Sequence, residues 1–172
     1  MKNLSVKEIV TGALGIALVF LATYLIKVPN GIQGYFNLGD GFILLFASIL
    51  NPFLAFLVGG VGSALADVAG GYAIYFIPTL LIKGIEAIVV SYLISKLGQK
   101  SRYIIYLIGE AIMVCGYFVA DAFINESWAL SATDIPSNVI QALAGYVIAL
   151  VCLPIISKQV LPEKRKQEVH CK

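Results

Sequence analysis

The chain has 172 residues, of which 59% are hydrophobic and 13% charged, and its formal net charge is +2. A water-soluble domain carries about 25% charged residues, so this composition excludes an ordinary soluble fold and indicates that the lipid bilayer is the solvent. The small net charge gives no basic surface for nucleic acid. We therefore expect an all-α integral membrane bundle, formed as a single domain over residues 1–172.

The apolar runs predict six spanning helices, because about 20 apolar residues cross the hydrocarbon core. The second and third helices are divided at Asn51-Pro52, because a proline disfavours helix at the residue before it. Both of these helices are short. The predicted spans are 8–28, 40–50, 53–69, 74–97, 103–124 and 136–157.

Positive charge predicts the orientation of these spans, because cytoplasmic loops carry an excess of Lys and Arg. With six crossings, the N-terminal segment, the connection between the fourth and fifth spans and the C-terminal tail lie on the same face. These three regions hold ten of the twelve basic residues. The opposite loops hold Glu126 and Asp134 but no Lys or Arg. We therefore predict a plasma-membrane protein with both termini in the cytoplasm. The ten basic residues are Lys2, Lys7, Lys96, Lys100, Arg102, Lys158, Lys164, Arg165, Lys166 and Lys172.

Ionisable side chains within the apolar runs are the main functional signal. Each costs roughly 2.5–3.5 kcal/mol to insert and usually faces a bundle interior or a watery cavity. The predicted span directions gather most of them in the outer half of the bundle, with Glu110 nearer the cytoplasm. The expected polar layer consists of Asp40, Asp67, Lys83, Tyr117, Asp121, Asn138 and Gln141.

Helical spacing places these side chains on one face of each of three helices. A polar stripe that faced lipid would be unfavourable, so the three stripes are predicted to converge on a pocket. The stripes are Thr79, Lys83, Glu86 and Val90; Glu110, Met113, Tyr117 and Asp121; and Asn138, Gln141 and Gly145.

Structural roles are open for several of these residues. Lys83 and Glu86 could form a self-satisfied pair at i,i+3, and Glu110 fits a structural or interfacial role. Asp67 follows a run of small residues that favours close helix contact, so it could bond to neighbouring backbone. Asn138, two residues after a proline, could have no role other than starting a helix.

The first external segment, residues 29–39, combines three glycines with the aromatic pair Tyr35 and Phe36. A lid that stacks these rings on a flat ligand is one interpretation, and anchoring at the membrane interface is the other. Trp128, in a later external loop, fits either interpretation.

Catalytic and metal-binding patterns are missing from the sequence. The single histidine, His170, lies in the charged tail. There is no metal-ligand spacing, no nucleophile–base pair and no phosphate-binding loop. We therefore expect a protein that is not an enzyme and uses no metal or cofactor.

Five short stretches together carry a resemblance to a known family, and they extend over nearly the whole chain. They are YFNLGD (35–40), GSALAD (62–67), PTLLIKG (78–84), GYFVAD (116–121) and NVIQ (138–141). In this order the chain resembles the substrate-binding S components of energy-coupling factor (ECF) vitamin transporters. The nearest subgroup handles pyridoxine, hydroxymethylpyrimidine and riboflavin, although Asp121 stands where that subgroup is expected to carry Glu.

The resemblance implies a six-helix bundle with an outer pocket for a vitamin or vitamin precursor, closed by the first external loop. Partners implied are a transmembrane T subunit and two ATPases. In this family the T subunit docks on small residues of the first helix, and here Ala13-x-x-x-Ala17 has the spacing that allows such close helix contact. This face could instead pack within the bundle. Substrate-binding residues expected on this basis are Tyr35, Phe36, Asp40, Asp67, Lys83, Tyr117, Asp121, Asn138 and Gln141.

Two other functional classes are open at this point. A self-sufficient proton- or ion-coupled transporter could use Glu86, Glu110 and Asp121 as a relay, although no inverted repeat is visible. An intramembrane enzyme with a carboxylate pair is disfavoured, because no two acids recur at matched depth beside a nucleophile.

Overall fold

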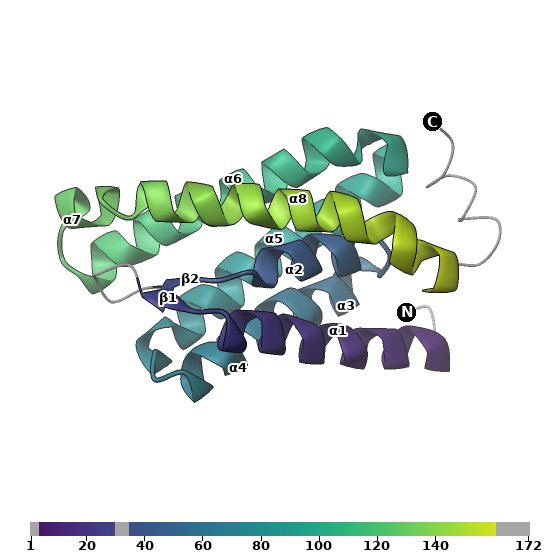
Figure 1. The fold of residues 1–172 in the computed structure, drawn as a ribbon, viewed down its shortest axis with the longest axis horizontal. Coiled ribbons are helices and arrows are strands. Elements are labelled where there is room, and N and C mark those ends of the chain that lie inside the picture. Colours follow the sequence, from purple (N-terminus) through teal and green to yellow (C-terminus); the bar gives the residue numbers. More distant parts are fainter. Residues whose placement is uncertain (1–3, 30–34, 161–172) are drawn as a thin grey trace.

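The computed structural model describes residues 4–29 and 35–160. The centre of the predicted lid (30–34) and the tail with His170 (161–172) lie outside the described residues. The described residues form a helical bundle (Figure 1) with one short antiparallel pairing, in which β1 (Val28–Pro29) lies beside β2 (Tyr35–Phe36). The principal helices are α1 (Val6–Leu25), α2 (Gly39–Ala47), α3 (Pro52–Phe56), α4 (Gly62–Ala69), α5 (Phe76–Leu97), α6 (Arg102–Ile124), α7 (Trp128–Ala132) and α8 (Ile135–Val160).

Five of the six predicted spans correspond to helical stretches long and apolar enough to cross a bilayer. The exception is the second span, because α2 has nine residues and is about 14 Å long at 1.5 Å per residue. The predicted count of six membrane-length helices is therefore not confirmed. The five stretches are Val6–Leu25, Pro52–Ala69, Ala73–Leu97, Gln99–Ile124 and Trp128–Ile156.

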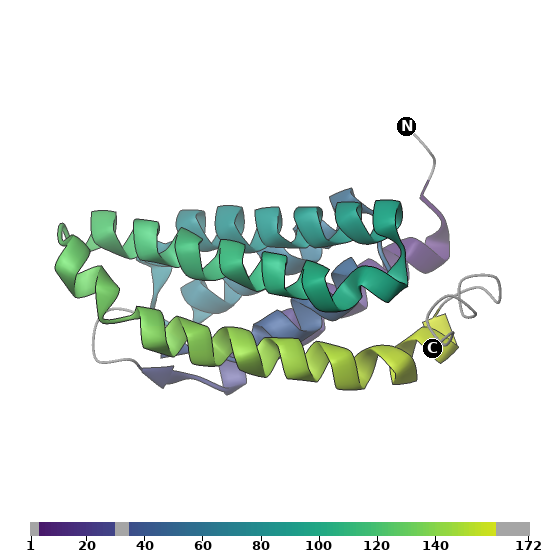
Figure 2. The same ribbon diagram turned by 90° about the horizontal axis from the view of Figure 1, so that it is seen from above.

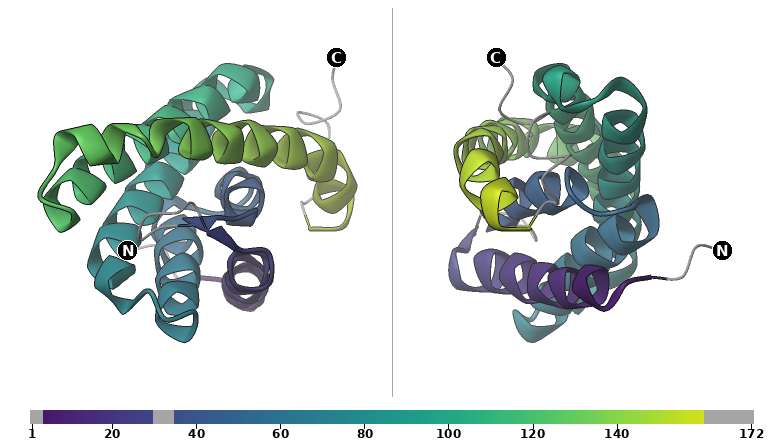
Figure 3. Two further views of the ribbon diagram at one scale, coloured as in Figure 1. Left: turned by 60° about the vertical axis from the view of Figure 1, so that its left-hand side comes forward. Right: turned by 90° about the vertical axis from the view of Figure 1, so that its right-hand side faces the viewer.

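The short α2 lies at the centre of the bundle. It packs against α1, α5, α6 and α8, and Figure 3 shows it enclosed by the longer helices. Within α2 only Phe42 is partly exposed. We call the half of the bundle that contains the hairpin between α2 and α3 the inner half, and the half that contains β1, β2 and α7 the outer half. The inner half is filled by apolar side chains from Ile43 to Ala47, packed with Val90, Tyr106 and Leu153.

The hairpin at Asn51-Pro52 forms as its proline predicts. The Asn51 side chain caps α3 by accepting a hydrogen bond from the Leu54 amide at 3.0 Å. A π-helical turn, Leu57–Val61, then joins α3 to α4. A Cβ added at Gly59 would lie 2.7 Å from the Lys83 carbonyl oxygen, so the small residues here allow the close contact with α5 that their run predicts.

Exposure on the outer helices is inverted relative to a soluble protein. Large apolar side chains face outward while Asp40, Lys83 and Glu86 are at most 1% exposed. Such a surface matches lipid and makes this chain a multi-pass membrane protein. Outward-facing examples are Ile9, Leu14, Ile77, Leu81, Ile104, Leu107, Ile140, Leu143 and Val151.

The small residues of α1 divide between two faces. Gly12 and Gly15 are buried, and an added Cβ would meet Leu54 and Val58 respectively. Ala13 and Ala17 are exposed on the outside of the bundle. The alanine pair is therefore not used for packing within the described residues.

The two ends of the bundle differ. Helix α1 begins and α8 ends at the right-hand end of Figure 1, where the hairpin between α2 and α3 also lies. At the opposite end α7, which the sequence did not predict, joins α6 to α8 (Figure 2). Trp128 of α7 packs on Phe118 and Phe123, with ring centroids 5.5 and 6.1 Å apart.

Candidate functional site

A cavity lies in the half of the bundle that contains β1, β2 and α7. It holds about 450 Å³ of space free of protein atoms, part of it open to solvent. Every residue that lines it has a polar atom in its side chain. The lining residues are Thr23, Tyr35, Asn37, Ser63, Asp67, Tyr75, Thr79, Lys83, Tyr117, Asp121, Asn138 and Gln141.

Two tyrosines hold the acidic groups at the rim of the cavity. The Tyr35 hydroxyl donates to Asp67 Oδ1 at 2.5 Å, and the Tyr75 hydroxyl donates to Asp121 Oδ1 at 2.8 Å. Burial, followed by the nearby Asp67 charge, raises the pKa of Tyr35 above its ordinary value, so this hydroxyl stays a donor. Asp67 Oδ2 has no hydrogen-bond partner among the described residues.

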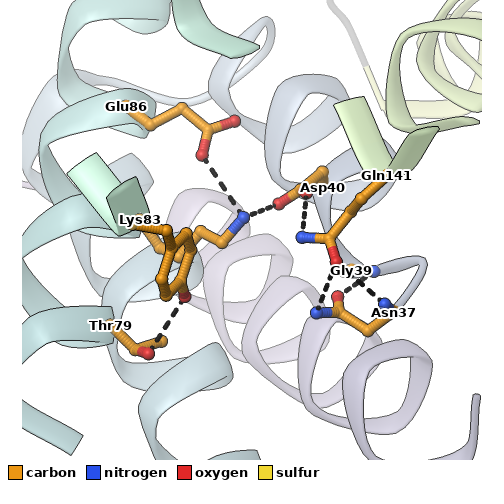
Figure 4. Close-up of polar contacts among 8 residues, drawn as sticks. Asn37, Gly39, Asp40, Thr79, Lys83, Glu86 and Gln141 are labelled. Atoms are coloured by element: carbon orange, nitrogen blue, oxygen red, sulfur yellow. Dashed lines mark hydrogen bonds and ion pairs between the residues drawn. The ribbon is translucent and has the colours of Figure 1, made fainter. Parts of the chain in front are cut away.

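The strand that leads into α2 is tied to α8 through a single amide. Gln141 Oε1 accepts from the Asn37 backbone N–H at 2.9 Å and from Asn37 Nδ2 at 3.2 Å. Gln141 Nε2 in turn donates to Asp40 Oδ2 at 2.7 Å. Asn37 Oδ1 accepts from the Gly39 amide at 2.9 Å, so one continuous network (Figure 4) satisfies the non-helical backbone.

Lys83 stands between this network and the cavity. Its ammonium forms an ion pair with Asp40 Oδ1, and Glu86 Oε2 lies 3.8 Å away. Figure 4 shows Lys83 reaching between these two carboxylates. On the cavity side the ammonium lies 5.3 Å from the centroid of the Tyr117 ring, whose hydroxyl is 3.0 Å from Thr79 Oγ1. The ion pair and the ring therefore hold Lys83 in a defined position.

Glu110 lies beneath the cavity, where it meets α2 and α8. A Cβ added at Gly145 would lie 2.6 Å from Glu110 Oε1 and 2.7 Å from Asp40 Cβ, so the two acidic side chains meet at this glycine. Glu110 is 3% exposed, and neither carboxylate oxygen has a hydrogen-bond partner among the described residues. Glu110 therefore lies below the cavity-lining residues Tyr117 and Asp121 of the same helix, and it meets Asp40 at that depth.

Lys27 lies outside the rim, within a group of tyrosines. Its ammonium is 4.5, 5.2 and 5.7 Å from the ring centroids of Tyr24, Tyr35 and Tyr72. Desolvation lowers the pKa of Lys27, and the Asp67 charge opposes that shift. Cation–π contacts thus connect the end of α1 to the strand that carries Tyr35.

Seven of the nine predicted binding residues line the cavity. Phe36 does not, because side chains alternate along a strand and its neighbours Tyr35 and Asn37 both face the cavity. Asp40 does not, because it lies behind Lys83. The seven are Tyr35, Asp67, Lys83, Tyr117, Asp121, Asn138 and Gln141.

Five lining residues were missing from the predicted set. Thr79 was already on the polar stripe of Lys83, and Asn37 follows from strand alternation with Tyr35, so both had a signal. Thr23, Ser63 and Tyr75 had none, because small hydroxyl residues and tyrosines are common in spanning helices wherever they face.

Comparison with known proteins gives a consistent result. Residues 3–158 match the family described as "ECF-type riboflavin transporter, S component". A Pyrococcus woesei protein named "Uncharacterized protein in gap 3′ region" is 33% identical over 146 residues, which cover 84% of this chain and 97% of that protein. The "Thiamine precursor transporter HmpT" of Lactococcus lactis subsp. cremoris is 24% identical over 160 residues, 92% of each chain. The chain therefore belongs to the family of ECF-type riboflavin transporter S components, and it is a transport protein rather than an enzyme.

Proposed function

We propose that this S component captures a single-ring vitamin or vitamin precursor, of the pyridoxine or hydroxymethylpyrimidine type, from outside the cell. The observation that carries the proposal is the cavity lined throughout by polar side chains. It stands above an inner half that is closed by the apolar side chains of α2. A ligand can therefore be held at one end of the bundle without a path through it.

The chemistry of the lining suits a flat ring with hydroxyl, amino or ring-nitrogen groups. Lys83 supplies donors, Asp67 supplies acceptors, and the amides of Asn138 and Gln141 supply both. The rings of Tyr35 and Tyr117 offer apolar faces for stacking.

A comparison supports the same class of ligand. The HmpT relative is named as a transporter of a thiamine precursor and matches 92% of this chain. Hydroxymethylpyrimidine is such a precursor, and its substituents are those that the lining can hydrogen-bond. Asp121, which takes the place of an expected Glu, shortens one acidic side chain at the rim of the cavity.

The segment that covers the cavity is the strand Tyr35–Phe36 with the adjoining Asn37. These residues are held to the bundle by the Tyr35–Asp67 and Asn37–Gln141 hydrogen bonds. Both contacts use groups that also line the cavity. We infer that this segment opens outward to admit the ligand and closes over it afterwards.

Delivery to the cytoplasm is assigned to an ECF module with a T subunit and two ATPases. The excess of positive charge supports a cytoplasmic position for the end of the bundle where α1 begins and α8 ends. The exposed Ala13 and Ala17 give α1 a small-residue face that allows close approach of a second membrane protein. We infer that the loaded bundle reorients against the T subunit while the ATPases cycle.

Binding by the purified protein tests the site. Calorimetric titrations with hydroxymethylpyrimidine, pyridoxine and riboflavin should show tight binding of a single-ring ligand. Asn138→Ala and Lys83→Ala should weaken it, while Glu126→Gln, an exposed change in a loop at the same end, should not. The Asn138 side chain makes no hydrogen bond with other described residues, so its variant should fold. Unchanged affinity in both cavity variants would place the site elsewhere.

A self-sufficient proton-coupled transporter is the second candidate, favoured by the buried and unpaired Glu110. The proposed relay is interrupted, because Asp121 is bonded to Tyr75 at the rim while Glu86 and Glu110 lie with Asp40 beneath the cavity. Uptake by the reconstituted chain alone, driven by a pH gradient, would support this candidate. Uptake only when the T subunit and ATPases are present would exclude it.

A further inference from the structure

We propose that Glu86 and Glu110 together form a proton-binding site directly beneath the cavity, and that the proton held there is linked to ligand binding through Lys83. The link to the ligand rests on the proposed function. The proton site itself does not, because it follows from the charges and partners of the buried side chains alone.

Beneath the cavity, three acids share one base. Asp40, Lys83, Glu86 and Glu110 come from α2, α5 and α6 and are each at most 3% exposed. The charges that act on Glu110 are Asp40, Glu86 and Lys83. Helix α8 contributes Gly145 at this contact and no charged group. If all three acids were ionised, this interior group would carry a net charge of about −2 in a medium that screens charge poorly.

Lys83 can neutralise only part of that charge. It makes its ion pair with Asp40, which also receives a hydrogen bond from Gln141, so Asp40 is the well-supported anion. Glu86 makes a longer ion pair with the same ammonium, at 3.8 Å, which is beyond hydrogen-bond length. Neither Glu86 nor Glu110 accepts a hydrogen bond from another described residue.

A proton resolves this imbalance. A buried carboxylate without a partner is strongly disfavoured and neutralises instead. Among the described residues no group of three His, Cys, Asp or Glu side chains is arranged to hold a metal ion. The glutamates therefore hold at least one proton between them, and Asp40 and Lys83 carry the remaining ion pair.

Lys83 couples this site to the cavity, because the same ammonium lines the cavity above and approaches Glu86 below. A ligand that accepts a hydrogen bond from Lys83 draws the ammonium away from Glu86. Glu86 then holds its proton more tightly in the bound state than in the free state. Since linkage is reciprocal, ligand affinity should fall as pH rises through the range in which the site loses its proton, by up to about tenfold per pH unit for one linked proton.

Infrared spectroscopy of the ligand-free protein tests the proton site without a ligand. The parent protein at neutral pH should show a protonated carboxylic acid band, which carbon-13 labelling of glutamate carboxyls shifts. Glu86→Gln/Glu110→Gln should remove the labelled band, and the exposed Glu126→Gln should leave it unchanged. If the double variant does not fold, the isotope shift in the parent decides alone. Absence of a shifted band at neutral pH would overturn the proposal.

Titration with hydroxymethylpyrimidine at several pH values tests the link. Affinity of the parent should fall with rising pH more steeply than affinity of Glu86→Gln, which lacks the linked carboxyl group while the ionisation of the ligand itself is unchanged. If affinity falls equally steeply with pH in the two proteins, the link between proton and ligand is overturned. The infrared experiment then tests the proton site by itself. Failure of every vitamin to bind would overturn the proposed function and the link, and the infrared band would still decide the proton site.

Discussion

The two halves of the bundle use the same helices for opposite purposes. In the inner half, α5, α6 and α8 close on α2, whose Ile43, Leu44 and Leu45 are fully buried. In the outer half the same three helices surround a cavity with polar walls. The change occurs at Asp40, in the first turn of α2.

The length of α2 explains the difference. A helix that continued to the outer end would fill the centre of the bundle throughout. Instead the chain is extended from Tyr35 to Asn37, and its backbone is satisfied by Gln141 and by the pairing of β1 with β2. Non-helical backbone within a membrane protein is tolerated where it lines a cavity, so the short helix and the cavity depend on each other.

Asp40→Ala, at the boundary between the halves, should have the largest effect. Removing one partner of a buried ion pair leaves Lys83 uncompensated and should lower the free energy of unfolding by about 3–5 kcal/mol. Denaturation in mixed micelles would measure this loss. The double variant Asp40→Ala/Lys83→Met should recover part of it, because no charge is then left alone. Equal destabilisation of the single and double variants would show that the ion pair is not the boundary element.

Leu44→Ala tests the packed half by itself. Leu44 is fully buried and lies against Gly109 of α6, so truncation should lower the free energy of unfolding by about 2–5 kcal/mol. Ligand affinity of the folded variant should match the parent, because the cavity does not include this residue. The control is Leu143→Ala, because Leu143 is 57% exposed on the outside of the bundle. This change should alter the free energy of unfolding by no more than about 0.5 kcal/mol. A large loss of affinity in Leu44→Ala would contradict the separation of the halves.

Tyr35→Phe tests the outer half and should have the smallest effect of the three. The change removes the hydrogen bond to Asp67 but keeps the ring, and hydrogen bonds to charged groups contribute about 1.5–3 kcal/mol. We expect faster ligand dissociation in stopped-flow measurements, because the segment that carries Tyr35 is held less firmly. Tyr72→Phe is the matched control, because its ring lies 4.7 Å from that of Tyr35 while its hydroxyl makes no hydrogen bond with other described residues. Equal rates in Tyr35→Phe and the parent would show that this contact does not hold the segment closed.

Much of the bundle could be predicted from local properties of the chain. Hydrophobic length located five spans to within about three residues of the ends of α1, α3–α4, α5, α6 and α8. The proline after Asn51 located the hairpin, and Asn51 caps the helix that follows it. Helical spacing placed Lys83, Tyr117 and Gln141 on inward faces, and all three line the cavity. These predictions succeeded because span length and helical phase are set by neighbouring residues.

The identity of each buried group's partner could not be predicted in this way. Spacing suggested Glu86 as the partner of Lys83, and the two do form an ion pair at 3.8 Å. The hydrogen-bonded partner of Lys83 is Asp40, 43 residues earlier in the chain, and spacing did not suggest it. The pairing exists because α2 enters the centre of the bundle, which depends on how distant helices pack around it.

What the sequence by itself determined is the class of protein and its polar faces, because the bilayer demands long apolar runs and makes every ionisable residue within them conspicuous. Only the tertiary structure decided that α2 ends half-way and that Glu110 meets Asp40 at Gly145. These features depend on contacts between segments far apart in the chain, and no local pattern of apolar and polar residues encodes such contacts.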